Sequence, residues 1–231
     1  MSRFSFAFDF DSTLVSVESL DELIALSLAE SLPPQAAKDA LSEIQSITDA
    51  GMNGDIDFMT SVTSRLKRAH TTRKHLQAFT KRIVRTVTPG IPAIIREIQQ
   101  SGCPVFILSG ALLECILPIA EQLGIPAGNV FANRPVFDAL GNLTGIEPGL
   151  LASTDGKTRC LKMLAESRRL RGDVVMVGDG ISDLHPYRAG IARHFLGVGF
   201  HRRREVIARE APHYFTSVSA LRGHIRFLLR P

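Results

Sequence analysis

Arg3-Phe4-Ser5-Phe6-Ala7-Phe8-Asp9-Phe10-Asp11-Ser12-Thr13-Leu14 is an apolar segment that ends in two carboxylates, a serine and a threonine. Its crowded aromatic side chains and its lack of helix formers predict a strand buried on both faces, as in a parallel sheet. Asp9 and Asp11 then fall at the carboxyl end of this strand, where open α/β sheets bind ligands. We therefore expect the rest of the chain to complete a site at this edge.

The two carboxylates suggest a catalytic pair. If the backbone stays extended for two more residues, Asp9 and Asp11 point the same way, because side chains repeat every second residue along a strand. Adjacent negative charges are tolerable when a cation lies between them or when one carboxylate holds a proton. A metal-bound Asp9 would stay nucleophilic, while Asp11 with a raised pKa could act as general acid and then base. The alternative is a strand followed by an Asp-Ser helix cap.

Length and composition indicate an ordinary globular protein. The 231 residues, 45% hydrophobic and 22% charged, fit one domain or one with a sizeable insertion. A net charge of +4 with no Trp and two Tyr gives little support for nucleic-acid binding, and the basic run His201 to Arg204 is predicted to be a solvated helix start. Three cysteines without CxxC spacing are expected to be buried thiols. The histidines form no HxxxH pair, so the sequence gives little support for a zinc site. With no apparent leader or membrane span, we expect a cytoplasmic protein.

The apolar periodicity divides the chain. It becomes helical from Ser16 to about Arg85, with breakers that separate several helices, and beyond Pro89 short apolar strands alternate with helices. We therefore predict an α/β fold, a Rossmann-like doubly wound parallel sheet with an inserted small helical-bundle cap. The expected core comprises residues 1–15 and 86–231, with a β-hairpin flap near 131–147, and the expected cap comprises residues 16–85.

Polar motifs follow the strands of this predicted sheet or begin its helices. In chain order they are Asp9 to Thr13, Ser109-Gly110, Lys157, and Gly178 to Asp183. Because the carboxyl ends of parallel strands face one crevice, these motifs should converge there. The carboxylates suit Mg²⁺, while Ser109, Lys157 and backbone amides suit the oxygens of a phosphoryl group. An Asp nucleophile would divide phosphate-ester hydrolysis into formation and breakdown of an aspartyl-phosphate.

These motifs, in this order, resemble those of the haloacid dehalogenase superfamily and more closely those of the phosphoserine phosphatases. The resemblance covers nearly the whole chain and implies a Mg²⁺-dependent phosphatase with Asp9 as nucleophile, Asp11 as acid/base and Lys157 as a third catalytic residue. The implied metal ligands are Asp9, Asp11, Asp179 and Asp183, with Asp183 either ligating the ion or orienting the site. The implied phosphate contacts are Ser109, Gly110, Lys157 and Ser182.

The expected cap carries the argument on substrate. The phosphoserine phosphatases resemble this chain in a Glu nine residues after the nucleophile, here Glu18, and in a Met-x5-Phe-x6-Arg pattern, here Met52, Phe58 and Arg65. The resemblance implies that Glu18 meets the substrate ammonium, that Arg65 meets its carboxylate, and that Met52 and Phe58 exclude water. The alternative makes Met52 and Phe58 cap core, and Glu18 and Arg65 solvated helix residues.

Two departures from the family pattern lie near the expected phosphate or substrate. Ser182 stands where these phosphatases usually have Asn, and Ala111-Leu112 stands where they usually have Gly-Phe. The expected function is hydrolysis of phosphoserine, the last step of serine biosynthesis, by a monomer or homodimer without nucleic-acid or membrane partners. A related phosphatase for another small phosphomonoester stays open, and a non-catalytic interaction module on the same fold is a more distant alternative.

Overall fold

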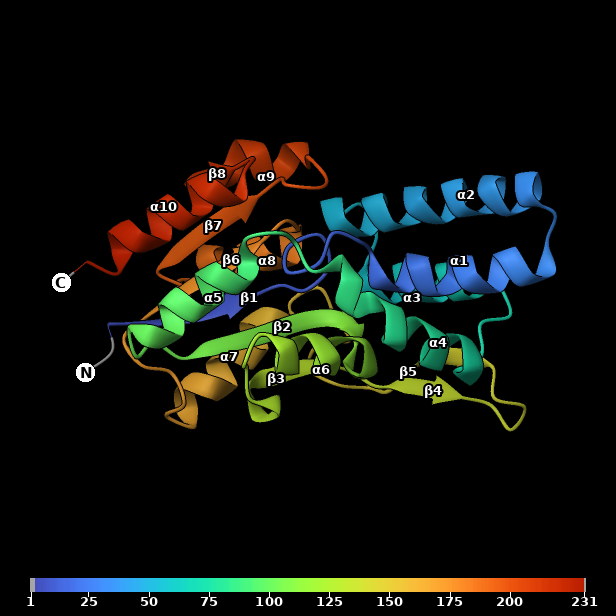
Figure 1. Cartoon of the computed structure of the whole chain (residues 1–231), viewed down its shortest axis with the longest axis horizontal. Helices are drawn as coiled ribbons and strands as arrows, with labels where there is room; N and C mark the ends of the chain where they lie inside the picture. The colour runs from blue at the N-terminus through green and yellow to red at the C-terminus, as the bar shows by residue number, and fades with distance from the viewer. Residues whose placement is uncertain (1–2, 231) are drawn as a thin grey trace.

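The computed structural model describes residues 3–230 and contains a sheet whose neighbouring strands all pair in parallel (Figure 1). The predicted fold class is confirmed. In spatial order the strands are β3 (Val130–Asn133), β2 (Val105–Leu112), β1 (Phe4–Phe8), β6 (Asp173–Gly178), β7 (His194–Val198) and β8 (His213–Phe215). The direction of winding reverses between β1 and β6, so the crevice that such sheets offer to ligands lies outside the carboxyl ends of these two strands.

Strand β1 is the centre of the sheet and is buried along its whole length. Phe6 pairs with Val105 on one side and with Val175 on the other. Phe4, Phe6 and Phe8 pack into the apolar core on one face of the sheet, and Ala7 packs into the core on the opposite face. This alternation explains why an almost uninterrupted apolar run forms a strand here.

Helices cover both faces of the sheet and supply the two cores. The first core receives apolar side chains from α5 (Ile91–Gln100), α6 (Leu113–Gln122) and α10 (Val218–Leu228). The second receives them from α7 (Gly156–Glu166), α8 (Ile181–Arg188) and α9 (Glu205–Glu210). With both faces covered, the functional groups can reach solvent only at the sheet's ends and edges.

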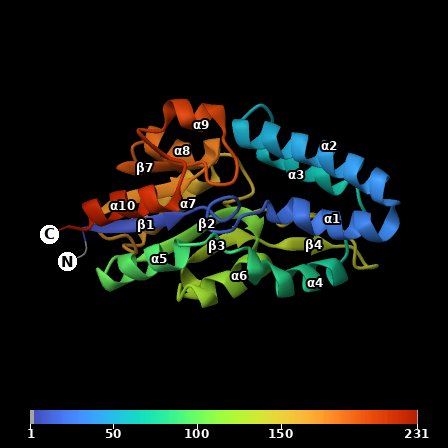
Figure 2. The ribbon, with the colours of Figure 1, turned by 45° about the horizontal axis from the view of Figure 1, so that its top comes forward.

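Four further helices, which we call the cap helices, lie at the end of the molecule opposite the chain termini (Figures 1 and 2). They are α1 (Ser19–Ser31), α2 (Pro34–Asn53), α3 (Phe58–Leu66) and α4 (Arg73–Ile83), followed by the 3₁₀ turn η1 (Val84–Thr86). The sequence sets their ends locally: Pro34 begins α2, Gly54 ends it with φ of 87°, and the Asp57 carboxylate accepts from Thr60 N–H at the start of α3.

An antiparallel hairpin lies beside the cap helices in Figure 1 and is formed by β4 (Pro135–Phe137) and β5 (Leu143–Ile146). The short 3₁₀ turn η2 (Ala127–Asn129) precedes β3. Met1, Ser2 and Pro231, which belong to the expected core, lie outside the described residues. Cys103, Cys115 and Cys160 are buried, as predicted. No helix within residues 3–230 is long and apolar enough to cross a membrane.

The backbone does not meet the condition under which Asp9 and Asp11 would point the same way. Strand β1 ends at Phe8 and a turn begins at Asp11, so the backbone does not stay extended through the second carboxylate. Ser12 has φ of 51°, a left-handed conformation that costs a non-glycine residue about 1–3 kcal/mol and that often marks functional sites. Strand β2 continues to Leu112, so Ser109 and Gly110 belong to the strand instead of following it as expected.

Candidate active site

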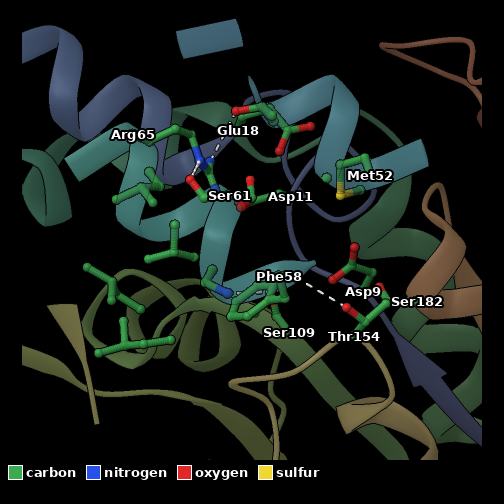
Figure 3. A pocket seen from close by; sticks show the side chains of 18 of the residues that line it. Asp9, Asp11, Glu18, Met52, Phe58, Ser61, Arg65, Ser109, Thr154 and Ser182 are labelled. Carbon is green, nitrogen blue, oxygen red and sulfur yellow. Dashed lines mark hydrogen bonds between the residues drawn. The ribbon is translucent and has the colours of Figure 1, made fainter. Parts of the chain in front are cut away.

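A cavity lies between the cap helices and the carboxyl ends of the strands (Figure 3). Both parts of the fold line it, together with the β4–β5 hairpin. The predicted site residues on its wall are Asp9, Asp11, Glu18, Met52, Phe58, Arg65, Ser109, Gly110, Lys157 and Ser182. The structure therefore gathers motifs from distant parts of the chain around one space. Asp179 and Asp183 lie behind this wall, in contact with its charged groups.

Three carboxylates form a cluster at the ends of β1 and β6. Asp9, Asp179 and Asp183 each offer an oxygen, and these oxygens lie within 4.8 Å of one another. All three residues are buried. Burial, opposed by Arg204 and reinforced by nearby carboxylates, raises the pKa of Asp179 well above its ordinary value. An all-oxygen cluster of this kind fits a hard divalent cation such as Mg²⁺, which would relieve the repulsion.

Lys157, at the start of α7, bridges two members of this cluster. Its Nζ lies 2.7 Å from Asp9 Oδ1 and 2.5 Å from Asp183 Oδ1. Burial lowers the pKa of Lys157, but Asp183 and Asp9 more than offset this effect, and the net pKa is above its ordinary value. Burial and the Asp9 charge raise the pKa of Asp183 to about 7, against the lowering effect of Lys157. The ammonium group is therefore fixed beside Asp9.

Asp11 lies apart from the carboxylate cluster. Its Oδ1 accepts from Ser19 N–H at 3.1 Å, and its Oδ2 accepts from Ser19 Oγ at 3.0 Å. These bonds turn its side chain toward the start of α1, so the structure does not bring the side chain to the other predicted metal ligands. Burial, followed by repulsion from Glu18 and Asp9, raises the pKa of Asp11 well above its ordinary value. A carboxyl group in this environment can hold a proton near neutral pH.

The groups predicted to contact phosphate lie on the core side of the cavity. Ser109 Oγ accepts from Ala111 N–H at 3.1 Å, which fixes the hydroxyl beside the end of β2. Asn133 Nδ2 donates to Gly110 O at 2.9 Å and steadies the same end of β2. Ser182 lies in the first turn of α8, whose N-terminus favours anions.

Glu18 is buried rather than solvated, which excludes the alternative interpretation for this residue. Its Oε1 accepts from Ser12 Oγ at 2.8 Å and from Arg204 Nη2 at 2.9 Å. Among the described residues, none donates to Oε2. Burial is the main cause of a raised pKa at Glu18, with Arg204 opposing it. Glu18 therefore faces the cavity with one carboxylate oxygen available.

Arg65 is likewise buried and has a free end. Its Nη1 donates to Asp21 Oδ1 at 2.9 Å and to Thr48 Oγ1 at 3.1 Å, and its Nε donates to Ser61 O at 3.3 Å. Within the described part of the chain, Nη2 has no hydrogen-bond partner. In Figure 3 the Arg65 and Glu18 side chains lie together on the cap side of the cavity.

Met52 and Phe58 bring the cap helices onto the core. A Cβ atom at Gly110 would lie 2.5 Å from Phe58 Cε2, and one at Gly180 would lie 2.6 Å from Met52 Cε. A side chain at either position would therefore force Phe58 or Met52 to move. Phe58 N–H also donates to Thr154 Oγ1 at 3.3 Å across the same boundary. The two apolar side chains therefore cover the cavity directly above the end of β2 and the start of α8.

Sequence reasoning missed Arg204, and its interpretation of the basic run was wrong at this position. Arg204 is 4% exposed and donates from Nε to Asp179 Oδ2 at 2.9 Å, in addition to its contact with Glu18. Nothing in the run of basic residues distinguishes Arg204 from Arg203, which is exposed and bonds Glu205. Asp21 was also missed, although an acidic residue among the apolar positions of α1 could have signalled a buried partner.

A family model described as haloacid dehalogenase-like hydrolase matches residues 6–186. This range contains the carboxylate cluster, Lys157 and all the cap helices. The chain belongs to the haloacid dehalogenase-like hydrolases.

Individual relatives indicate which kind of hydrolase within this family the chain resembles. The chain is 31% identical to phosphoserine phosphatase of Homo sapiens over 219 residues, which cover 94% of this chain and 91% of the human protein, and 32% identical to that of Bos taurus over 94% and 90%. A phosphoserine phosphohydrolase-like protein from Francisella tularensis has a similar structure, with a TM-score of 0.83 and 30% identity over 96% of this chain and 99% of that one. A solved structure of a phospho-aspartyl intermediate analogue of phosphoserine phosphatase has a TM-score of 0.75 and 27% identity over 94% of each chain. The protein is a phosphatase of the phosphoserine phosphatase family.

Proposed function

We propose that the protein hydrolyses phosphoserine to serine and phosphate through an aspartyl-phosphate, with Mg²⁺ as cofactor. One observation carries the proposal: Glu18 Oε2 and Arg65 Nη2 both lack partners among the described residues, on the wall of the cavity that contains Asp9. One free acceptor and one free cationic donor match the ammonium and carboxylate groups of an amino acid. The nucleophile for the phosphate lies in the same space.

The proposed reaction assigns separate roles to the two aspartates. Asp9 attacks phosphorus, and Asp11 donates a proton to the departing serine oxygen and later accepts one from the attacking water. The raised pKa of Asp11, caused by burial and by Glu18 and Asp9, supports the acid role. The similar phosphoserine phosphatase was solved as a phospho-aspartyl intermediate analogue, which supports a covalent route.

Charge on the phosphoryl group would be balanced from two sides. Asp9, Asp179 and Asp183 would hold Mg²⁺, which supplies positive charge beside the phosphoryl oxygens when bound. Lys157, Ser109, Ser182 and the Gly110 amide would donate to the remaining oxygens. Asp11 would act as acid/base alone, because its carboxylate is engaged by Ser19 instead of joining the carboxylate cluster.

We further propose that residues 16–85 act as a movable cap on the core formed by residues 1–15 and 86–231, with the hairpin near 131–147 as a flap. Met52 and Phe58 close over Gly180 and Gly110, so a substrate would enter when these contacts separate. Water would then be excluded while Asp9 is phosphorylated. A monomeric or homodimeric state and a cytoplasmic location stay predictions.

Three phosphate esters test the proposal on substrate. Phosphoethanolamine lacks the carboxylate of phosphoserine, and 3-phosphoglycerate has a hydroxyl group in place of the ammonium group. We expect kcat/KM for phosphoserine to exceed both values by at least about tenfold, the scale of one charged hydrogen bond. Equal values for all three esters would refute amino-acid recognition and leave the phosphatase assignment intact.

The second candidate is a family phosphatase for a different small phosphomonoester. It is favoured by Ser182, whose hydroxyl reaches less far than the amide usual at this position. Ala111 and Leu112, which line the same cavity region, also depart from the family pattern. Testing both phosphoserine enantiomers beside a wider panel of small phosphomonoesters would distinguish this candidate from the first.

A further inference from the structure

Arg204 connects three separate parts of the fold. It lies directly before α9 in the core, and its nitrogens donate to carboxylates from three different segments. Nε reaches Asp179 Oδ2 at the end of β6, Nη2 reaches Glu18 Oε1 before α1, and Nη1 reaches Asp49 Oδ1 on α2, each at 2.9 Å. The planar guanidinium is thus held at all three of its nitrogens.

Asp49 is the member of this group that belongs to a cap helix far from the catalytic motifs. It lies near the C-terminal end of α2, and its Oδ1 also accepts from Arg202 Nη1 at 2.7 Å. Arg202 and Arg204 therefore hold α2 against the core by a pair of charged contacts. Asp49 is 47% exposed at its side chain, whereas Arg204 is 3% exposed, so only the arginine end of the contact is buried.

The buried position of Arg204 makes its partners interdependent. A guanidinium removed from water is tolerable only while carboxylates surround it. Glu18 and Asp179 are themselves buried, and Arg204 is the cation that both share. Both Arg204 and Ser12 engage the same Glu18 oxygen, which is why the other oxygen stays available. Movement of α2 would remove Asp49 and loosen the guanidinium that orients the two site carboxylates.

We propose that Arg204 is a positioning residue that couples cap closure to the active-site carboxylates, with Asp49 as its contact on the cap. When α2 is docked, Asp49 fixes the guanidinium, which then holds Glu18 for the substrate ammonium and Asp179 in its place within the carboxylate cluster. This inference rests on the proposed function for the identities of the substrate and the metal. The coupling itself concerns only contacts between described residues.

Two variants separate the cap contact from the site contacts. Asp49→Asn weakens the contact between Arg204 and α2 without changing the residues Arg204, Glu18 and Asp179 themselves. Arg204→Lys keeps one positive charge, but its donors all belong to one nitrogen, whereas the three contacts of Arg204 use three separate nitrogens. Arg203→Gln is the matched control, because this neighbouring arginine is exposed and bonds only Glu205 among the described residues.

The first measurement is hydrogen exchange of residues 46–55 in the metal-free protein, which needs no substrate. We expect roughly 3- to 10-fold faster exchange in Asp49→Asn, the scale of a partly exposed ion pair, and no change in Arg203→Gln. The second is steady-state kinetics with phosphoserine and with an aryl phosphate. Asp49→Asn should raise KM by a similar factor with little change in kcat, whereas Arg204→Lys should lower kcat/KM on the order of 10²-fold.

The proposed coupling also predicts an effect on metal binding. Mg²⁺ affinity measured by calorimetry should fall in Arg204→Lys and stay unchanged in Arg203→Gln. The proposal would be overturned if hydrogen exchange of residues 46–55 and KM both stay at the wild-type level in Asp49→Asn. If Arg204→Lys does not fold, the Asp49→Asn results alone decide the question. If phosphoserine is not a substrate, the exchange and aryl-phosphate results still decide the coupling, so the two failures are distinguishable.

Discussion

Arg65→Lys tests substrate recognition more cleanly than removal of the side chain. Arg65 and Asp21 are 8% and 3% exposed and form a buried ion pair at 2.9 Å. Arg65→Ala would leave Asp21 buried and unpaired, which costs about 3–5 kcal/mol of stability and would obscure any effect on catalysis. A lysine can keep this pair but has a single nitrogen, whereas arginine has Nη2 to spare for a substrate carboxylate.

The size of the effect follows from comparing the two contacts. A charged hydrogen bond to the substrate contributes about 1.5–3 kcal/mol, which is less than the cost of leaving Asp21 buried without a partner. The lysine should therefore keep its ion pair with Asp21 instead of contacting the substrate. The lost contact predicts a decrease of roughly 10- to 100-fold in kcat/KM for phosphoserine. For phosphoethanolamine, which has no carboxylate, the decrease should be below about threefold. Urea unfolding should show that stability changes by less than about 1.5 kcal/mol, as for tolerated substitutions.

Arg68→Lys is the matched control for this experiment. Arg68 lies just after the C-terminal end of α3, the helix that contains Arg65. It pairs with Glu43 at 3.3 Å, but both side chains are exposed. It should leave both substrates unaffected. A loss in Arg65→Lys that is equal for phosphoserine and phosphoethanolamine would refute the assignment of Arg65 to the substrate carboxylate, because it would indicate a misplaced cap instead.

Three other predictions concern the nucleophile, the metal and stability. Asp9→Asn should abolish turnover of an aryl phosphate and Asp11→Asn should lower kcat roughly 10²–10⁴-fold; near-normal turnover in Asp9→Asn would end the covalent scheme. Chelation should remove activity and added Mg²⁺ should restore it, whereas full activity after exhaustive chelation would contradict a metal requirement. Hydrogen bonds from Arg226 and Arg222 lower the pKa of Glu97 to about 2, so Glu97→Gln should cost about 0.5–1 kcal/mol at pH 7 after allowance for solvent screening. Because this stability is present above the unfolded-state pKa and is lost as pH falls through about 2, wild type and variant should converge in acid urea titrations, and a constant difference would exclude the ion pairs as its cause.

The sequence determined the fold class and the chemical groups of the site. Strand β1 could be predicted because a short, almost uninterrupted apolar run is typical of a strand that is buried on both faces of a parallel sheet. The order of strands and helices then required Asp9, Ser109 and Asp179 to meet at one edge, since parallel strands present their carboxyl ends together. These inferences depend on local patterns and on topology, and neither needs the position of a particular side chain.

Only the tertiary structure decided how charges are shared within the site. Asp11 turns away from the carboxylate cluster because the chain bends after Phe8 and offers it the Ser19 N–H, a turn that strict extension of the strand did not anticipate. Arg204 looks like its exposed neighbour Arg203 in sequence, yet it is buried among carboxylates that lie 25 and 186 residues away. Local sequence carries little information about such pairs, because whether a charge is solvated or buried depends on which distant segments fold against it.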